Sequence, residues 1–296
     1  MSEITLKQLR YFEAVASAGH FGRAADACSI SQPAISLQIK ELEETLGIAL
    51  FDRGGRQIRL TSFGEDLIER TRSILRSVDD LGDFTRTAQD SFVGRLRLGV
   101  IPTIAPYLLP KVIAQLADSY ADLDLNIRET QTEKLIVDLI DGRLDTAIVA
   151  LPISEPSLHE KPLFDEKFVL VRSMGDAALP IPSRAGLREM KLLLLEEGHC
   201  FRDQALSFCN LQPVTPRETM EGSSLSTLVQ MVGAGIGVTL IPEMAVGVET
   251  KSADVSVARF PDPQPSRTIG MVWRRSSPLD KQLRKIAGVV GQSVQF

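Results

Sequence analysis

Hydrophobic and polar positions repeat with two different periods, which separate a helical N-terminal part from a longer remainder of mixed structure. Through residues 5–18 an apolar side chain recurs about every third position, as on one face of an amphipathic helix. Residues 62–87 contain no proline and place apolar or small side chains at alternating steps of three and four, which predicts one long helix. From Gly94 onward, strand-like segments alternate with helical stretches of roughly ten to fifteen residues. This alternation is typical of βαβ units built on a parallel sheet.

A helix-turn-helix is predicted directly after the first helix. Residues 21–27 favour a short alanine-rich helix, and residues 28–30 favour a tight turn. The next helix begins with Ser31 as N-cap and Pro33 in its first turn, where the missing amide hydrogen of proline costs nothing. Two short helices joined by so short a turn form the helix-turn-helix unit. Residues 48–61 predict the two short strands of a β-hairpin wing.

The long helix carries a narrow seam of apolar and small side chains. A seam of this width suits pairing with a second copy of the same helix. The alternative is a helix that lies on its own domain. The seam consists of Leu67, Thr71, Ile74, Val78, Leu81 and Thr85.

Beyond the long helix, the pattern predicts two small α/β lobes with a cleft between them, the usual place for a ligand in such sheets. The first set of strands is RLRLGV, DLDLNIRET and LDTAIVAL, with a helical stretch after IPTIAPYLLP. The second set is KFVLVRS, KLLLLE, GVTLIP and IGMVWR, followed by a closing helix from about residue 279. We therefore expect a winged helix-turn-helix over residues 1–62, a linker helix over residues 63–92 and a two-lobed domain over residues 93–296.

Composition restricts the class of protein. A chain of 296 residues is long for one core, which agrees with two or three compact units. Hydrophobic residues make up 44% and charged residues 24%, as in a globular protein. The first residues alternate charge with apolar side chains, and no apolar run is long enough for a membrane span, so neither a secretion signal nor a membrane partner is expected. A cytoplasmic location follows as an expectation, and thiols are kept reduced there.

The net charge of −5 gives no indication of nucleic acid, but the distribution of charge does. In residues 1–62, seven Lys or Arg balance seven Asp or Glu, and the acids of the second helix lie toward its far end. Its first turns present short polar side chains suited to base edges, and the wing arginines suit phosphates. A helix-turn-helix pattern alone is a weak signal, because many small helical cores share it. The candidate DNA contacts are Ser31, Gln32, Pro33, Ser36, Gln38, Lys40, Arg53, Arg56 and Arg59.

Two of the three cysteines lie nine positions apart in EEGHCFRDQALSFC, residues 196–209. A reactive cysteine needs surroundings that favour its thiolate, and Cys200 has His199 before it, Arg202 after it and a predicted helix N-terminus beside it. Cys209 has apolar neighbours that would keep it buried. If one helix spans both, their Cα atoms lie roughly 13 Å apart on opposite faces. A disulfide requires about 4.4 to 6.8 Å, so its formation would have to unwind the segment.

The residues alone leave other roles open for these groups. Cys209 fits a buried core thiol better than a resolving one, Cys28 fits core packing, and His199 fits a surface or capping residue. A zinc site is not expected, because the Cys-x8-Cys spacing with one adjacent histidine is not a recognised zinc pattern. A cysteine hydrolase would need a histidine and an orienting acid or amide, and the chain has only three histidines.

The segment FGRAADACSISQPAISLQIKELEETLGIALFDR resembles the DNA-binding signature of LysR-type transcriptional regulators. The stretches GVIPTIAPYLLP, GRLDTAI, GAGIGVTLIP and SRTIGMVWR are similar to the effector half of that family, so the resemblance covers the whole chain. It implies a winged helix-turn-helix, a dimerising linker helix and a periplasmic-binding-protein-like regulatory domain of two lobes. It also implies a regulator rather than an enzyme, with promoter DNA, further copies of itself in a dimer or tetramer and RNA polymerase as partners, and no cofactor.

The stretch EEGHCFRDQALSFC resembles the peroxide-sensing members of that family in particular. In those proteins hydrogen peroxide oxidises the residue equivalent to Cys200 to a sulfenic acid, and the equivalent of Cys209 then closes a disulfide on it. The resemblance therefore implies a peroxidatic Cys200 and a resolving Cys209. Many of these proteins have a histidine shortly before the helix that begins SSLSTL, and RETMEGSSLSTL has none. The expected peroxide pocket consists of Thr103, Thr132, His199, Arg202 and Asp203.

Alternatives remain for the pocket and for the function. Thr103 and Thr132 suit a peroxide oxygen as hydroxyl donors, but both also precede helical stretches that they could cap. Asp203 could anchor Arg202 or the start of the helix. A regulator of the same architecture that reads a metabolite in the cleft, with incidental cysteines, is the first rival function. A thiol peroxidase is the second, and it leaves the first 60 residues unexplained.

Overall fold

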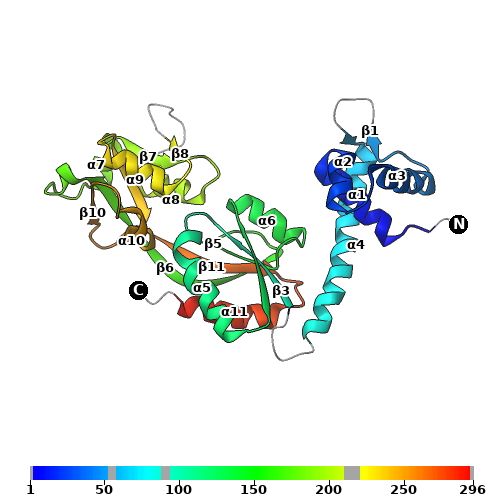
Figure 1. The fold of residues 1–296 in the computed structure, drawn as a ribbon. Helices are drawn as coiled ribbons and strands as arrows, with labels where there is room; N and C mark the ends of the chain where they lie inside the picture. Colours follow the sequence, from blue (N-terminus) through cyan, green and yellow to red (C-terminus); the bar gives the residue numbers. More distant parts are fainter. Residues whose placement is uncertain (1–2, 53–57, 88–93, 210–220, 294–296) are drawn as a thin grey trace. The chain divides into compact units, whose positions relative to one another are not determined.

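The computed structural model describes residues 3–52, 58–87, 94–209 and 221–293. The chain separates into two compact units, residues 1–85 and residues 86–296, and Figure 1 labels most of their elements. Among the described residues, no helix combines the length and the apolar character needed to cross a bilayer.

The first unit is a helix-turn-helix with a small wing, as expected. Its helices are α1 (Leu6–Ala18), α2 (Phe21–Ala27) and α3 (Gln32–Leu46), and its wing pairs β1 (Phe51–Asp52) with β2 (Arg59–Leu60) in antiparallel fashion. The hydroxyl of Ser31 accepts a hydrogen bond from the amide of Ala34 at 3.4 Å, so the predicted N-cap of α3 is present. The ring of Phe51 meets the rings of Phe12 and Phe21 edge to face, with centroids 5.5 and 6.0 Å away, which joins the wing to the helical core.

The predicted seam lies on the long helix α4 (Ser62–Thr87), and its two ends differ in burial. Near its start, Leu67 packs against the helix-turn-helix core, and Thr71 is buried. Farther along, Ile74 and Leu81 expose 47% and 67% of their surface. The seam therefore lies partly on its own domain, and its exposed part is available to another surface. Pairing of two α4 helices stays a prediction.

The second unit consists of two lobes that share one mixed sheet. Its strand order is β4-β3-β5-β11-β6-β9-β7-β8, and β10 also pairs with β6. In lobe 1, β3 (Gly94–Val100) is parallel to β4 (Leu123–Glu129) and β5 (Thr146–Leu151), and β11 (Ser266–Arg274) is antiparallel to β5. The helices of this lobe are α5 (Ala105–Ser119), α6 (Thr132–Ile140) and α11 (Asp280–Gln292).

Lobe 2 is built on the second half of β6 (Leu158–Ser173), which pairs with β9 (Val238–Pro242) and β10 (Val255–Arg259). On the other side of β9, β7 (Leu192–Leu195) is parallel to β9 and to the short β8 (Glu221–Gly222). Its helices are α7 (Arg184–Glu189), α8 (Cys200–Cys209), α9 (Leu225–Gly233) and α10 (Val246–Glu249). The first half of β6 pairs with β11 of lobe 1, so one continuous strand joins the lobes.

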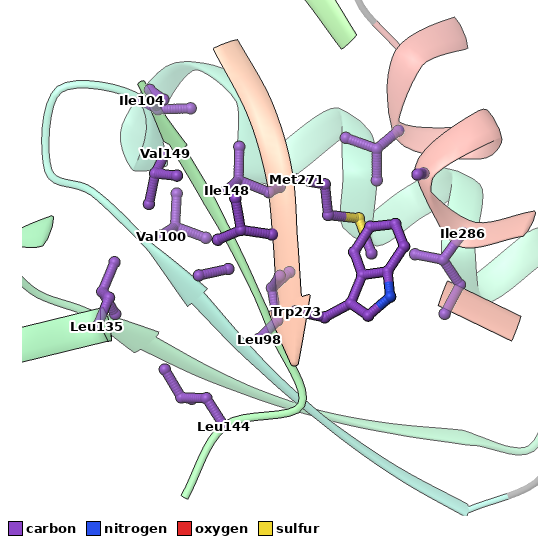
Figure 2. Packing of buried hydrophobic residues seen from close by; sticks show 14 of the residues in the cluster. Leu98, Val100, Ile104, Leu135, Leu144, Ile148, Val149, Met271, Trp273 and Ile286 are labelled. Atoms are coloured by element: carbon purple, nitrogen blue, oxygen red, sulfur yellow. The ribbon is translucent and has the colours of Figure 1, made fainter. Parts of the chain in front are cut away.

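Three expectations from the pattern need correction. IGMVWR and the closing helix belong to lobe 1, because Trp273 and Met271 of β11 and Ile286 of α11 are buried in one cluster with Leu98 of β3 (Figure 2). The sheet is mixed rather than parallel, since β11 and β6 are antiparallel to their neighbours in lobe 1. Helix α5 begins before Tyr107 rather than after IPTIAPYLLP, because one proline falls in its first turn and the helix accommodates another in its interior.

Candidate functional site

The two thiols lie at opposite ends of α8, which begins at Cys200 and ends at Cys209. Neither cysteine is part of a disulfide. Cys209 is fully buried in the core of lobe 2, whereas Cys200 is half-buried and packs against the core of lobe 1. A ten-residue helix separates their Cα atoms by about 13 Å, so a disulfide between them requires α8 to unwind.

Cys200 lines a small pocket to which both lobes contribute. Lobe 1 supplies residues 101–103 after β3 and residues 131–132 at the start of α6, and lobe 2 supplies residues 198–200 before and at the start of α8. The empty volume is about 170 Å³, and the gap between the atoms is too narrow for a molecule the size of water. Of the five predicted pocket residues, the structure places Thr103, Thr132 and His199 around Cys200.

Neither Thr103 nor Thr132 caps the helix that follows it. The N-cap of α5 is Ile104 and that of α6 is Gln131, and neither helix start has a side-chain capping bond. Thr103 is 3% exposed, and its hydroxyl accepts a hydrogen bond from Nη1 of Arg267 at 2.8 Å. The Oγ1 atom of Thr132 is buried and has no hydrogen-bond partner. A buried hydroxyl without a partner costs about 1–3 kcal/mol, which a bound polar molecule would relieve.

A buried ion pair that was not predicted from the sequence holds Thr103 of this pocket. Arg267 on β11 pairs with Glu166 on β6, with Nη2 and Oε2 at 2.6 Å, and its Nη2 also donates to the carbonyl oxygen of Thr103 at 3.1 Å. Its guanidinium lies over the ring of Phe201, 5.2 Å from the centroid. Burial raises the pKa of Glu166, and the charge of Arg267 opposes that shift. The available signal was an arginine two positions before the apolar run of β11, because such charges are seldom buried without a partner.

Of the other three predicted pocket residues, His199 lines the pocket, whereas Arg202 and Asp203 do not. Burial lowers the pKa of His199, with Glu196 opposing, so its imidazole is mostly neutral at pH 7 and supplies little positive charge to Cys200. Arg202 does not line the pocket: its Nη1 donates to the carbonyl of Leu195 at 2.9 Å and to Oε1 of Glu221 at 2.6 Å. Asp203 does not anchor Arg202, because successive helical side chains point about 100° apart. It lies exposed in the first turn of α8, where a negative charge stabilises the helix start.

The predicted DNA-contacting surface is largely exposed on α3. Ser31, Gln32, Pro33 and Lys40 are exposed, and Ser36 and Gln38 are half-buried. Two of these side chains have intrahelical partners. Gln38 donates to Oε2 of Glu41 at 2.6 Å, and Lys40 lies 3.5 Å from Glu44 in an exposed pair that contributes only about 0.3–0.5 kcal/mol.

In the wing, Arg59 is exposed, whereas Arg53 and Arg56 lie outside the described residues. The turn before α3 holds the third cysteine. Cys28 packs beside the core of this unit, and burial, with a smaller effect of Glu13, raises its pKa. The thiol of Cys28 therefore stays protonated, which agrees with a role in core packing. Among the described residues, no group of three or more His, Cys, Asp and Glu side chains could hold a metal ion.

Similarity to known proteins extends over both units. The lysR family of bacterial regulatory helix-turn-helix proteins matches residues 6–65, and the LysR substrate binding domain matches residues 89–295. A probable hydrogen peroxide-inducible genes activator of Streptomyces viridosporus is 43% identical over 298 residues, which cover 98% of this chain and 95% of that protein. The DNA-binding transcriptional dual regulator OxyR of Escherichia coli K12 is 38% identical over 292 residues, covering 97% and 95%.

Solved structures give the same result. A full-length OxyR variant from Pseudomonas aeruginosa has a TM-score of 0.78 at 35% identity and covers 98% of this chain and 95% of its own. A hydrogen-peroxide-bound OxyR mutant from Corynebacterium glutamicum has a TM-score of 0.68 at 35% identity, covering 99% and 94%. The chain therefore belongs to the LysR family of bacterial regulators, and within that family it is similar to OxyR.

Proposed function

We propose that this chain is a peroxide-responsive transcription regulator in which the thiol state of Cys200 and Cys209 controls its engagement of promoter DNA. One observation carries the proposal. Cys200 shares a small pocket with the hydroxyls of Thr103 and Thr132, and a second thiol, outside any disulfide, lies buried at the far end of the same helix. Relatives named as hydrogen peroxide-inducible activators, similar over almost the whole chain, support it.

The chemistry needs only the peroxide and the two thiols. The thiolate of Cys200 attacks one peroxide oxygen, so that an S–O bond forms, the O–O bond breaks and the leaving hydroxide takes a proton to become water. Hydrogen bonds from Thr103 and Thr132 hold the peroxide and stabilise the charge that develops on it. The thiol of Cys209 then attacks the sulfenic sulfur, a second water leaves, and the disulfide forms.

Disulfide formation acts on the fold through α8. The helix is held in lobe 2 by the ring of Phe201 on Phe168, with centroids 4.9 Å apart, and by the ring of Phe208 on Phe260, 5.2 Å apart. Bringing its two ends together breaks these contacts and the hydrogen bond from Arg188 to the carbonyl of Cys209. Such a local order change beside a second lobe is a recognised way to shift the arrangement of subunits.

The remaining parts follow from the family and the exposed surfaces. Residues 1–62 bind DNA, with the start of α3 in the major groove and Arg59 of the wing near phosphates. Residues 63–92 pair two copies through the exposed part of α4, and residues 93–296 sense the oxidant. Assembly into dimers and tetramers, contact with RNA polymerase, a cytoplasmic location and a non-enzymatic role complete the proposal.

The test compares reduced and peroxide-treated protein. Non-reducing mass spectrometry is expected to find a Cys200–Cys209 cross-linked peptide, and promoter footprints are expected to differ between the two states. Cys200→Ser and Cys209→Ser should both abolish the cross-link, while Cys28→Ser serves as the control and should behave as wild type. A peroxide-dependent footprint that survives in Cys200→Ser would contradict the proposal and favour a metabolite-sensing regulator.

A further inference from the structure

We propose that Gln131 is the gate of the Cys200 pocket and that it selects hydrogen peroxide over bulkier hydroperoxides. The inference rests on the proposed function, because a gate matters only if Cys200 reacts with peroxide. It adds a residue and a specificity that no similarity above assigns.

Gln131 occupies a helix start without acting as a cap. It is the N-cap residue of α6, but its side chain makes no capping bond. N-cap positions favour Ser, Thr, Asp and Asn, whose short side chains reach the first amides of the helix. The longer side chain of Gln131 instead crosses to lobe 2, where its Nε2 donates to the carbonyl oxygen of Glu197 at 3.3 Å. The amide therefore spans the gap between the lobes.

The same amide covers the backbone beside Cys200. Gly198 has a φ of +90°, and a Cβ added to it would lie 2.8 Å from Nε2 and 3.0 Å from Cδ of Gln131. The two groups are thus in close contact across the pocket, whose remaining space does not admit a water-sized molecule. Entry of any oxidant requires something at this rim to move.

Gln131 is the rim group best able to move. Ile101 and Thr103 line the pocket but are buried, and Thr103 is held by Arg267. Pro102 is rigid, and Gly198 has no side chain. Gln131 is half-buried and carries the longest flexible side chain of the pocket. The hydrogen bond from Gln131 to the carbonyl oxygen of Glu197 is long and solvent-exposed, so it breaks easily.

Size selection follows from this geometry. Hydrogen peroxide needs only a small displacement of the amide, whereas a hydroperoxide with a branched alkyl group must displace the whole side chain. In both cases the thiolate of Cys200 attacks the terminal oxygen, an S–O bond forms and the O–O bond breaks. The leaving hydroxide or alkoxide takes a proton and departs as water or as the alcohol. The bond changes are the same, so a change in relative rate on substitution of Gln131 reports access.

The test uses the full-length reduced protein with hydrogen peroxide or tert-butyl hydroperoxide. Formation of the Cys200–Cys209 disulfide is followed by quenching with a thiol alkylator and mass spectrometry. Gln131→Ala should raise the rate with tert-butyl hydroperoxide by about tenfold or more and change the rate with hydrogen peroxide by less than about threefold, as expected when a pocket gains room for extra methyl groups. Gln131→Asn introduces a favoured N-cap residue whose side chain no longer reaches Glu197, so its effect should be smaller and in the same direction. Lys134→Ala, which shortens an exposed side chain of the same helix, should behave as wild type.

Two results would overturn the gate. If both Gln131 variants keep the wild-type ratio of the two rates while forming the disulfide with hydrogen peroxide, the gate is wrong and the proposed function stands. If wild type forms no Cys200–Cys209 disulfide with either oxidant, the proposed function itself fails and the gate falls with it.

Discussion

Thr103 and Thr132 line the same pocket, yet their hydroxyl groups are in opposite situations. The hydroxyl of Thr103 satisfies a donor of the buried Arg267, whereas that of Thr132 is buried without a partner. The first hydroxyl supports the fold, and the second is a cost that the folded protein carries. Such costs are typical of sites shaped for a ligand rather than for stability.

Matched valine substitutions should separate the two roles. Thr132→Val removes the unpartnered hydroxyl and should raise the free energy of unfolding by about 1 kcal/mol, while slowing disulfide formation by hydrogen peroxide. Thr103→Val leaves a donor of Arg267 unsatisfied and should lower that free energy by about 1–3 kcal/mol. Urea unfolding of the reduced proteins measures both. Equal effects of the two substitutions on stability would contradict the assignment.

His199 makes the stability of the protein depend on pH in a defined direction. Burial lowers its pKa in the folded state, so the unfolded chain binds a proton more readily. Its contribution is fully present above the unfolded value of about 6.5 and is lost as the pH falls through that value toward the folded pKa. His199→Gln should therefore lose less stability than wild type between pH 7.5 and 5.5, as measured by urea unfolding. The variant should still lose some stability as the pH falls, because burial also lowers the pKa of His159. Parallel pH profiles of the two proteins would refute the effect.

At the scale of single elements, local signals predicted the DNA-binding part well. Ser31 and Pro33 mark the start of α3 through their own backbone chemistry, so no distant residue is needed to recognise it. The position of the wing, however, depends on a contact with α3 that the local sequence pattern does not show. Oε1 of Glu43 on α3 accepts hydrogen bonds from the amides of Leu50 and Phe51 at 2.8 and 3.3 Å. The sequence pattern indicated only that Glu43 lies away from the DNA groove, whereas the structure shows that it orients the first strand of the wing.

Two glycines in helices make a test of packing between elements. A Cβ on Gly64, in the first turn of α4, would overlap the carbonyl oxygen of Leu50, whereas a Cβ on Gly288 of α11 meets nothing within 4 Å. Alanine normally stabilises a helix interior by about 0.8–1.0 kcal/mol relative to glycine. Gly288→Ala should therefore raise the thermal midpoint, and Gly64→Ala should lower it. A higher midpoint for Gly64→Ala would mean that α4 and the wing strand are not packed this closely.

At the scale of the whole molecule, the parts that the pattern missed depend on residues far apart in the chain. Arg267 meets Thr103 only because β11 returns to the sheet of lobe 1. The first half of β6 likewise pairs with β11, which is distant in the sequence. Gln131 in lobe 1 has its hydrogen-bond partner, Glu197, in lobe 2. Periodicity reports the face of an element, not its neighbour, so it could find two lobes and still assign the last strand and helix to the wrong one.

The two lobes are also joined by a buried hydrogen-bond chain. Tyr107 on α5 of lobe 1 packs against the core of lobe 2, and its hydroxyl donates to Oε1 of the buried Glu249 at 2.6 Å. Ser226 donates to the other oxygen of that carboxylate at 2.5 Å. Burial, with the hydrogen bond to Glu249, raises the pKa of Tyr107 well above its ordinary value, so the phenol stays a donor.

Tyr107→Phe should lower the free energy of unfolding by about 1–3 kcal/mol, because it leaves one oxygen of Glu249 buried without its donor. Ser226→Ala removes the other donor and should have an effect of the same sign. Urea unfolding of the reduced full-length protein measures the change. An unchanged free energy of unfolding in Tyr107→Phe would mean that the hydrogen bond from Tyr107 to Glu249 does not stabilise the contact between the lobes.

The path of β6 through both lobes also governs the order in which a ribosome can complete them. Lobe 2 takes its core from one continuous stretch, from Phe168 to Phe260, so its residues are all available once that stretch has emerged. Lobe 1 needs Trp273 and Val290 for its core, and it stays open until the last helix has been made. During synthesis, α8 with its two thiols is therefore enclosed before the lobe that completes the pocket around Cys200.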